Sequence, residues 1–228
     1  MLVEKIQLDD NNPNVTLTTY VLDDSVELSA GKKRPAILIC LGGAYLNCFD
    51  REGEPVALRF AAMGYHAVVL RYNVFMTESD DFSVVFEGKH LEKCDHSIYP
   101  AAIRDIAKAF VTIHDHAVEW LVDTDKIAIC GFSAGGNNVL NYAVNYDKAV
   151  ITDVFDSEKV KPAVVVASYP LSDYVYMKEF LKTQDDMAKN LFRIGNLSLF
   201  GKEEPTEEEF AKLSPNRLVT QTTPPTFL

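Results

Sequence analysis

The sequence lacks several features that mark particular classes of protein. No run reaches the roughly 18 apolar residues that a membrane-spanning helix needs, and the N-terminus has no basic stretch followed by an apolar one. The 4 cysteines show neither the paired spacing of a metal site nor a disulfide framework. We therefore predict a cytoplasmic protein with reduced thiols and no membrane partner.

Clusters of basic residues are also missing. The chain has 228 residues and a formal net charge of −11, with 22 Lys and Arg residues scattered among 33 Asp and Glu residues. Nucleic acid binds to basic patches, so this pattern predicts no nucleic-acid partner. With 47% hydrophobic residues, the chain is long enough for one well-buried α/β domain over residues 1–228.

Histidine is absent after position 116. The 5 histidines are His66, His90, His96, His114 and His116. His90 and His96 flank a cysteine without a second ligand pair, which favours solvated loop histidines over a metal site. His114 and His116 fall near the C-terminal end of a predicted helix, whose partial negative charge favours a protonated imidazole. We predict no bound metal and no cofactor.

One stretch joins a buried strand, a tight turn and a helix. Ile127–Cys130 is apolar and partly β-branched, as in a buried parallel strand, and apolar residues recur at helical spacing after Gly136. Gly131–Gly135 between them has the G-x-S-x-G pattern of a nucleophile elbow, where a sharp turn holds the hydroxyl of Ser133 clear of the backbone. The alternative interpretation is a glycine-rich turn with an incidental serine.

Two backbone segments are candidate donors to an oxyanion near Ser133. At the start of the helix the N–H of Ala134 has no intrahelical partner, and we expect it to point to where an oxyanion would form. A second apolar strand, Pro35–Leu41, ends in Gly42-Gly43-Ala44-Tyr45, where a backbone with small side chains can turn its N–H groups toward a neighbouring site. A Gly-Gly pair alone more often marks a plain turn.

The rest of the chain predicts a mostly parallel sheet with helices on both faces and an N-terminal antiparallel hairpin. The expected elements are a hairpin (3–8 and 15–22), a helix (54–63), a strand (66–72), a surface excursion (74–97), a helix (100–121), a strand (162–169), helical segments typical of a cap (174–202), a helix with a capping box (206–213) and the start of a buried strand (224–228). Asp173 follows a strand end, where it caps a turn or, less expectedly, reaches the site.

These motifs, taken in order, resemble the α/β-hydrolase superfamily. The segments that carry the resemblance are Leu41–Tyr45, the 54–63 helix, Tyr99-Pro100 with its long helix, Gly131–Gly136, and Ser214-Pro215 before Pro224–Leu228. Within the superfamily the chain is similar to small carboxylesterases and acetyl-xylan-esterase-like enzymes related to the hormone-sensitive lipase group. The resemblance covers nearly the whole chain.

The resemblance implies a serine carboxylesterase for short, acetyl-type esters. Ser133 would be the nucleophile, and the N–H groups of Gly43, Ala44 and Ala134 would form the oxyanion hole. Related enzymes often read His-Gly-Gly-Gly or Pro-Gly-Gly-Gly in the loop that matches Leu41–Ala44. Leu41 and Ala44 replace the first and last members of that motif, and these changes keep the backbone N–H donors. The implied partner is a small ester, with an acetylated sugar as one candidate; a homo-oligomer is left open.

The resemblance also predicts that part of the fold is missing. In this superfamily the chain order is nucleophile, acid, histidine, whereas every histidine here precedes Ser133. Relatives continue past the segment matching Pro224–Leu228 with an acid loop, a helix, a strand and a histidine loop. We therefore expect a chain without its last strand and helix, nearly inactive by itself. The alternative hypothesis is a non-catalytic, hydrolase-like binding or scaffold protein.

Overall fold

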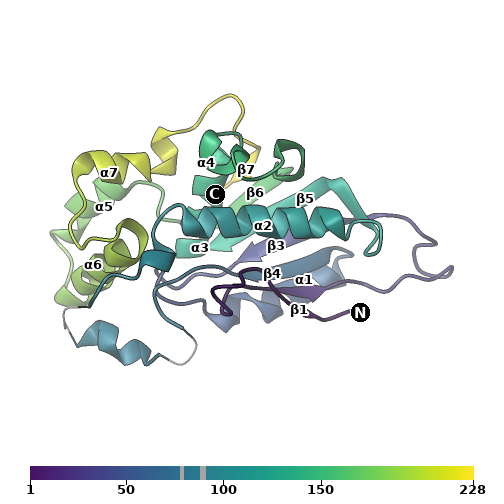
Figure 1. Ribbon diagram of the computed structural model, residues 1–228, viewed down its shortest axis with the longest axis horizontal. Helices are drawn as coiled ribbons and strands as arrows, with labels where there is room; N and C mark the ends of the chain where they lie inside the picture. The colour runs from purple at the N-terminus through teal and green to yellow at the C-terminus, as the bar shows by residue number, and fades with distance from the viewer. Residues whose placement is uncertain (78–79, 88–90) are drawn as a thin grey trace.

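The computed structural model describes residues 1–77, 80–87 and 91–228, and its strands form one 7-stranded sheet in the order β1-β2-β4-β3-β5-β6-β7 (Figure 1). The strands are β1 (Lys5–Gln7), β2 (Thr16–Tyr20), β3 (Arg34–Cys40), β4 (His66–Arg71), β5 (Val122–Phe132), β6 (Val164–Ser168) and β7 (Thr226–Phe227). β1 pairs with β2 and β2 with β4 in antiparallel fashion, and the other pairs are parallel. The predicted hairpin at the sheet edge and the mostly parallel sheet are confirmed.

Helices cover both faces of this sheet. They are α1 (Glu54–Ala62), α2 (Ala101–Asp115), α3 (Ala134–Asn145), α4 (Ala149–Thr152), α5 (Tyr174–Leu181), α6 (Asp186–Phe200) and α7 (Glu207–Lys212), with short 3₁₀ turns η1 (Asp50–Glu52), η2 (Phe82–Phe86), η3 (Asp95–Ser97), η4 (Ser157–Lys159) and η5 (Pro215–Arg217). In the sheet, β4 lies on the hairpin side of β3, whereas β5 and β6 lie on the opposite side of β3, so the chain reverses direction across the sheet after β4. Because crossovers between parallel strands are right-handed, α1 packs on one face and α2 and α3 on the other. Figure 1 shows α2 lying across the near face.

The core lies on either side of the central strands. Ala36–Cys40 of β3 is buried throughout, which explains why the strand is an unbroken apolar run. The largest fully buried side chains include Leu17, Ile37, Leu38, Ile39, Leu70, Tyr72, Ile106, Phe110, Ile113 and Tyr142. Phe110 of α2 stacks on Tyr142 of α3 with ring centroids 5.6 Å apart. This packing fixes α3, and with it the turn that precedes α3, against the sheet.

Helix α2 is shorter than its apolar pattern predicts. It ends at Asp115, and the chain then turns, with Leu121 at φ 55° before β5 begins. Trp120 is buried by this turn, and the backbone N–H of Trp120 donates to the carbonyl oxygen of His116 at 2.8 Å. The predicted end at Leu121 is therefore wrong, because the apolar spacing continued into a buried turn that is not helical.

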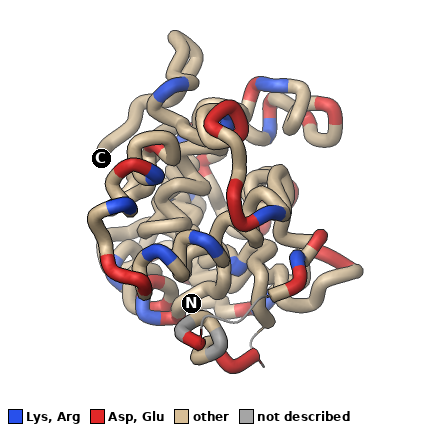
Figure 2. The backbone as a smooth tube through the Cα atoms, turned by 90° about the vertical axis from the view of Figure 1, so that its left-hand side faces the viewer, with Lys and Arg blue, Asp and Glu red and all other residues tan. Residues whose placement is uncertain are grey.

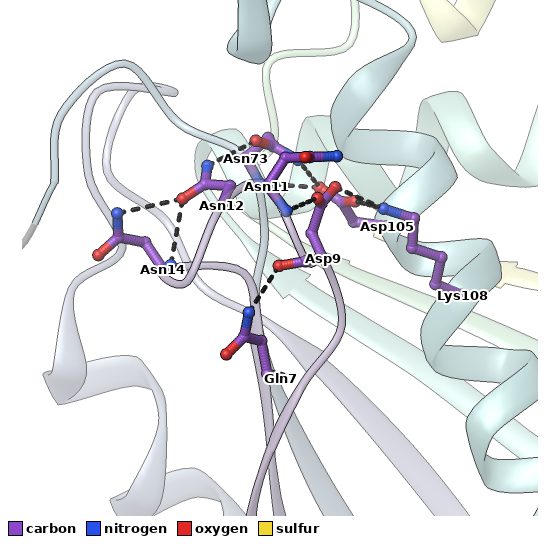
Figure 3. Close-up of polar contacts among 8 residues, drawn as sticks. All are labelled: Gln7, Asp9, Asn11, Asn12, Asn14, Asn73, Asp105 and Lys108. Atoms are coloured by element: carbon purple, nitrogen blue, oxygen red, sulfur yellow. Dashed lines mark hydrogen bonds and ion pairs between the residues drawn. The ribbon is translucent and has the colours of Figure 1, made fainter.

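A buried polar network ties the hairpin turn to α2 (Figure 3). Asp105, only 1% exposed, accepts hydrogen bonds from the backbone N–H and the side-chain Nδ2 of Asn73, at 2.9 and 2.7 Å. Lys108 lies 3.2 Å from Asp105 and donates to Asp9 at 2.8 Å. Asn12 donates to Asn73 at 2.8 Å. The turn between β1 and β2 is thus held to the loop after β4 and to α2.

The segment after β4 is less superficial than predicted. Met76 and Val85 are buried with Leu46 and Ile194 in a second, smaller apolar cluster. This cluster joins the loop after β3 to α6, so Met76 and Val85 form part of the support for that loop. His90, which the sequence analysis assigned to a solvated loop, lies outside the described residues.

The C-terminal part of the chain contains one confirmed and one wrong prediction. Thr206 and Glu209 form the predicted capping box of α7, each side chain accepting from the other residue's backbone N–H. The strand at the end, β7, is not buried: Phe227 is 70% exposed. Within the described residues β7 pairs with β6 alone, so only one of its edges is covered.

Charge and hydropathy of the surface follow the composition. Figure 2 shows Lys and Arg interspersed with Asp and Glu along the visible backbone, and the sequence has 22 basic and 33 acidic residues. In the part of the chain that the structure describes, no helix is both long and apolar enough to cross a bilayer. The same residues contain no group of three potential metal ligands from His, Cys, Asp and Glu.

Candidate active site

Ser133 occupies the turn between β5 and α3. The strand ends at Phe132 and the helix begins at Ala134, which is the strand–turn–helix context that the sequence predicts. Ser133 has φ 51° and ψ −113°, a region that costs a non-glycine residue of the order of 1–3 kcal/mol. Its N–H donates to the carbonyl oxygen of Ser168 at 3.0 Å, which fastens the turn to the end of β6. The surrounding structure thus imposes a strained conformation on this serine.

Close backbone contact explains the glycine that follows. A Cβ at position 135 would run into the carbonyl oxygens of Cys40 and Leu41 at the end of β3. Only glycine lets the first turn of α3 approach β3 this closely. The contact brings the N-terminus of α3 beside the loop that follows β3.

The loop after β3 is held in an unusual conformation. Gly43 has φ 144°, and Ala44 and Tyr45 have φ 56° and 61°. A left-handed conformation costs an L-residue roughly 1–2 kcal/mol, so these two residues need support. Tyr45 receives it: its O–H donates to Oδ1 of Asn137 at 2.7 Å, and its carbonyl oxygen accepts from Oγ of Ser198 at 2.7 Å.

Three backbone N–H groups near Ser133 are left without acceptors. The N–H groups of Gly43, Ala44 and Ala134 donate to no other described residue. That of Ala134 belongs to the first turn of α3, where helix N–H groups have no intrahelical partner and the dipole favours negative charge. Of the four residues that the sequence analysis assigned to the site, the structure brings Ser133, Ala44 and Ala134 to one cavity, and Gly43 precedes Ala44 without lining that cavity. The structure leaves the three N–H donors free to bind a ligand oxygen.

A cavity of about 240 Å³ opens beside these residues. Ser133, Ala134 and Ala44 line one side of it. The other side is mainly apolar and comes from the segment after β6 and from α5 and α6: Leu171, Met177, Leu181, Ala188, Leu191 and Phe192. The two helices predicted as a cap thus border the cavity next to Ser133.

The described histidines lie elsewhere, and none lines this cavity. His66 begins β4, at the opposite end of the sheet from the turns, and its Nδ1 accepts from the N–H of Leu22 at 3.0 Å. His96 contacts the carbonyl oxygen of Val74 at 3.0 Å. Burial, followed by the charge of Lys159, lowers the pKa of His114, which is the opposite direction to the effect predicted from the helix end.

Asp173 has a structural task. It caps α5 by accepting from the N–H of Tyr176 at 3.0 Å, and it pairs with Arg217 at 2.9 Å and Asn216 at 3.0 Å. Burial alone would raise the pKa of Asp173, but these partners outweigh it and lower the pKa to about 2. The turn-capping interpretation of this carboxylate holds, and Asp173 does not line the cavity.

One residue near Ser133 was missed by the sequence analysis. Glu52, in η1, is only 7% exposed, and its carboxylate accepts from the N–H of Gly42 at 2.6 Å and from the O–H of Tyr169 at 2.9 Å. Glu52 and the more exposed Glu54 stand two residues apart around Gly53, and no local pattern separates them. Only the fold, which brings the distant Tyr169 to Glu52, reveals the difference.

Comparison with known proteins adds a family and a fold. The BD-FAE family model matches residues 25–228. Endo-1,4-beta-xylanase B of Butyrivibrio fibrisolvens is 29% identical over 218 residues, which are 93% of this chain and 28% of that protein. The chain thus spans little more than a quarter of this curated relative.

Solved structures agree on the fold. MGS-M1, an α/β hydrolase enzyme from a Medee basin deep-sea metagenome library, is 37% identical with a TM-score of 0.58, over 75% of this chain and 57% of that one. The carboxylesterase Cest-2923 from Lactobacillus plantarum WCFS1 is 24% identical with a TM-score of 0.68, over 100% and 70% of the two chains. An acetyl ester-xyloside bifunctional hydrolase from Caldicellulosiruptor lactoaceticus is 24% identical with a TM-score of 0.68, over 99% and 73%. The predicted α/β-hydrolase fold is confirmed.

Proposed function

The chain belongs to the BD-FAE family and has an α/β-hydrolase fold, and on that premise we propose that it is a serine hydrolase of carboxylic esters. One observation carries the proposal. Ser133 stands on a strained turn at the edge of an apolar cavity, beside three backbone N–H groups that bind no described residue. A nucleophile and an oxyanion hole need that arrangement.

The proposed reaction has two steps. Oγ of Ser133 attacks the ester carbonyl, and the N–H groups of Gly43, Ala44 and Ala134 bind the resulting oxyanion. The C–O bond to the alcohol then breaks, the alcohol leaves with the proton from the serine, and an acyl-serine remains. Water attacks this ester in the same way and releases the carboxylic acid, restoring the hydroxyl of Ser133.

Proton transfer is the slow part of this scheme in the 228-residue chain. No described histidine lines the cavity, and Asp173 is committed to capping α5, so an Asp–His pair is not at hand to activate Ser133. An oxyanion hole and substrate binding alone accelerate hydrolysis by roughly a thousandfold over water. We expect the chain by itself to show turnover of this low order.

Cavity size bears on the substrate. About 240 Å³ with apolar walls holds an acyl group larger than acetyl, so short-chain esters up to a medium length fit the space. The names of two similar proteins, a xylanase and an acetyl ester-xyloside hydrolase, support an acetylated sugar as one substrate, in which the sugar is the alcohol component. We treat residues 174–202, which include α5 and α6, as a cap insertion in a single domain of residues 1–228.

The test compares ester hydrolysis by the native chain with that by Ser133→Ala. With p-nitrophenyl esters of two to eight acyl carbons, we expect Ser133→Ala to hydrolyse more slowly than the native chain, because it loses the acyl-serine route and keeps only the acceleration that the oxyanion donors and the cavity give to direct attack by water. Ser168→Ala is the matched control, since it removes a hydroxyl one strand away while leaving the carbonyl that binds the N–H of Ser133. Equal rates for the native chain and Ser133→Ala would refute the proposal.

The second candidate is a non-catalytic, hydrolase-like binding protein. The absence of a described histidine at the cavity favours it. A reversible ligand of serine hydrolases separates the two candidates without needing turnover: phenylboronic acid forms a tetrahedral adduct with an exposed, oxyanion-supported serine. Binding that disappears in Ser133→Ala favours the hydrolase, whereas a cavity that binds esters equally well with and without the hydroxyl favours the binding protein.

A further inference from the structure

Glu52 is a buried carboxylate that the proposed reaction does not use. It is 7% exposed, and a buried charge is strongly unfavourable unless it is paired and hydrogen-bonded. Arg51 is a poor partner, because its Nε lies 4.0 Å away and its side chain is 70% exposed. The two hydrogen bonds that stabilise the carboxylate come from Gly42 and Tyr169.

The first of these bonds fixes the residue before the oxyanion donors. The N–H of Gly42 donates to Glu52 at 2.6 Å, a short distance typical of a charge-assisted bond, and the carbonyl oxygen of Gly42 accepts from Phe49 at 3.0 Å. Gly42 is therefore held on both sides. The next two residues along the chain, Gly43 and Ala44, carry the free N–H groups.

Glu52 also lies close to the nucleophile. A Cβ at position 42 would come within 2.7 Å of Oε2 of Glu52 and within 3.2 Å of Cβ of Ser133, so both side chains flank the same glycine. No side chain other than hydrogen fits between them. The carboxylate thus occupies the N–H of Gly42, whereas the N–H groups of the next two residues bind none of the described residues.

The second bond reaches the other side of Ser133. Tyr169 follows β6, has φ 40°, and donates its O–H to Glu52 at 2.9 Å although 66% of the residue is exposed. Its ring contacts Phe132 with centroids 6.0 Å apart. Because β5 lies between β3 and β6, Glu52 links the loops on both sides of the turn that carries Ser133.

We propose that Glu52 is the positioning residue of the oxyanion hole, an inference that rests on the proposed ester hydrolysis. Its carboxylate orients the loop after β3, and Tyr169 orients the carboxylate. A purely electrostatic effect would have the opposite sign, since a negative charge near an oxyanion destabilises it and its removal would speed the reaction. The sign of the change on neutralising Glu52 therefore decides the matter.

The chain supplies a matched pair of controls. Tyr20 donates its O–H to Glu54 at 3.2 Å, so a second tyrosine–glutamate bond exists two residues along, away from Ser133. Glu52→Gln and Tyr169→Phe test the positioning role of Glu52 and of the hydrogen bond from Tyr169. Glu54→Gln and Tyr20→Phe repeat the same chemical changes at the control pair. We expect Glu52→Gln to lower kcat about tenfold to a hundredfold, less than the loss of a whole oxyanion donor, with KM changed less than about twofold. Tyr169→Phe should lower kcat about threefold to tenfold, and the controls should stay within about twofold.

Phenylboronic acid provides a readout that needs no turnover. We expect Glu52→Gln to weaken its binding about tenfold, and Glu54→Gln to leave it unchanged. Unchanged or faster hydrolysis and unchanged boronate binding in Glu52→Gln would overturn the positioning role. If Glu52→Gln does not fold, Tyr169→Phe, which retains the ring against Phe132, decides by the same criteria. Failure of the proposed function is distinct: the native chain and Ser133→Ala would then hydrolyse esters equally, and neither would bind the boronate.

Discussion

Two clusters of buried polar groups in this chain differ in what they leave unpaired. In the network of Figure 3, Asp105, Asn73, Lys108 and Asp9 bind one another, and the result is a fixed connection between the hairpin turn and α2. Around Ser133 the backbone is also held by hydrogen bonds, but the N–H groups of Gly43, Ala44 and Ala134 bind none of the described residues, and Ala44 and Ala134 line a cavity. Polar groups that are all hydrogen-bonded to one another stabilise the fold. Backbone N–H donors that are held in place without an acceptor can bind a ligand.

The largest effect should come from breaking the saturated cluster. Asp105→Ala removes the acceptor for Asn73 and a partner of Lys108, and breaking a buried pair typically costs 3–5 kcal/mol. Since the Lys108 side chain is 30% exposed and can be rehydrated, we expect about 3 kcal/mol in the free energy of unfolding, measured with urea.

A surface pair provides the control for this experiment. Asp123 lies 2.7 Å from Lys126, whose side chain is 67% exposed, so Asp123→Ala should cost less than about 1 kcal/mol. Similar losses in Asp105→Ala and Asp123→Ala would contradict the view that the network of Figure 3 stabilises the fold through burial.

A smaller effect, shared between stability and activity, is expected at the contact beneath Ser133. The methyl group of Gly135→Ala meets the carbonyl oxygens of Cys40 and Leu41, so the start of α3 must shift. We expect a loss of about 2 kcal/mol in unfolding free energy and a fall in Ser133-dependent hydrolysis. Gly195→Ala in α6 is the control: its methyl group meets one oxygen, of Ala44, at 3.1 Å, and its stability should stay within about 1 kcal/mol of the native chain. Wild-type hydrolysis in a stable Gly135→Ala variant would show that the close contact is not needed.

The sharpest form of the comparison predicts a gain in stability. Ser133→Gly relieves the positive φ, so the free energy of unfolding should rise by about 1 kcal/mol while hydrolysis is lost. Ser168→Gly, the same change inside β6, should lower stability by about 0.5–1 kcal/mol. If thermal unfolding finds Ser133→Gly no more stable than the native chain, the strain at this turn is not a cost of function.

The smallest effect concerns pH. Asp173 has its pKa lowered to about 2 in the fold, so its stabilising contribution is complete above the unfolded pKa near 3.8 and disappears as pH falls through about 2. We expect the native chain to lose about 1 kcal/mol more than Asp173→Asn between pH 4 and pH 2, a value reduced for solvent screening. Hydrolysis at pH 7 should change less than twofold in Asp173→Asn. A large loss of hydrolysis in Asp173→Asn would show that Asp173 contributes to function as well as to the structure.

Local patterns were sufficient to predict most of the fold. The apolar runs of β3, β5 and β6, the turn at Ser133 and the capping box at Thr206 each depend on residues close in sequence. Their physical causes, namely burial between two helical layers and pairing of free helix N–H groups, are written in short segments. The end of α2 was misplaced because Trp120 is buried by a turn, and burial looks the same in a helix or a turn.

Long-range contacts set the part that the sequence could not predict. Glu52 becomes a buried carboxylate only because Tyr169, far along the chain, lies two strands away in the sheet and donates to it. The left-handed conformation of Ala44 and Tyr45 likewise depends on Asn137 and Ser198. The four predicted site residues came from a local motif and a short loop, whereas the groups that hold them in place came from the rest of the chain.

The hydrogen bond between Ser198 and Tyr45 bears on how a ligand would reach the cavity. Oγ of Ser198 in α6 donates to the carbonyl oxygen of Tyr45, which directly follows Ala44. Moving α6 away as a lid would therefore displace the loop after β3. Hinged lids open on the microsecond-to-millisecond scale, whereas exposed side chains rotate within nanoseconds. We therefore expect a ligand to enter by rotation of flexible side chains that line the cavity, such as Met177 and Leu191. Under the proposed function, the N–H groups beside Ser133 would then keep their positions while a substrate enters and a product leaves.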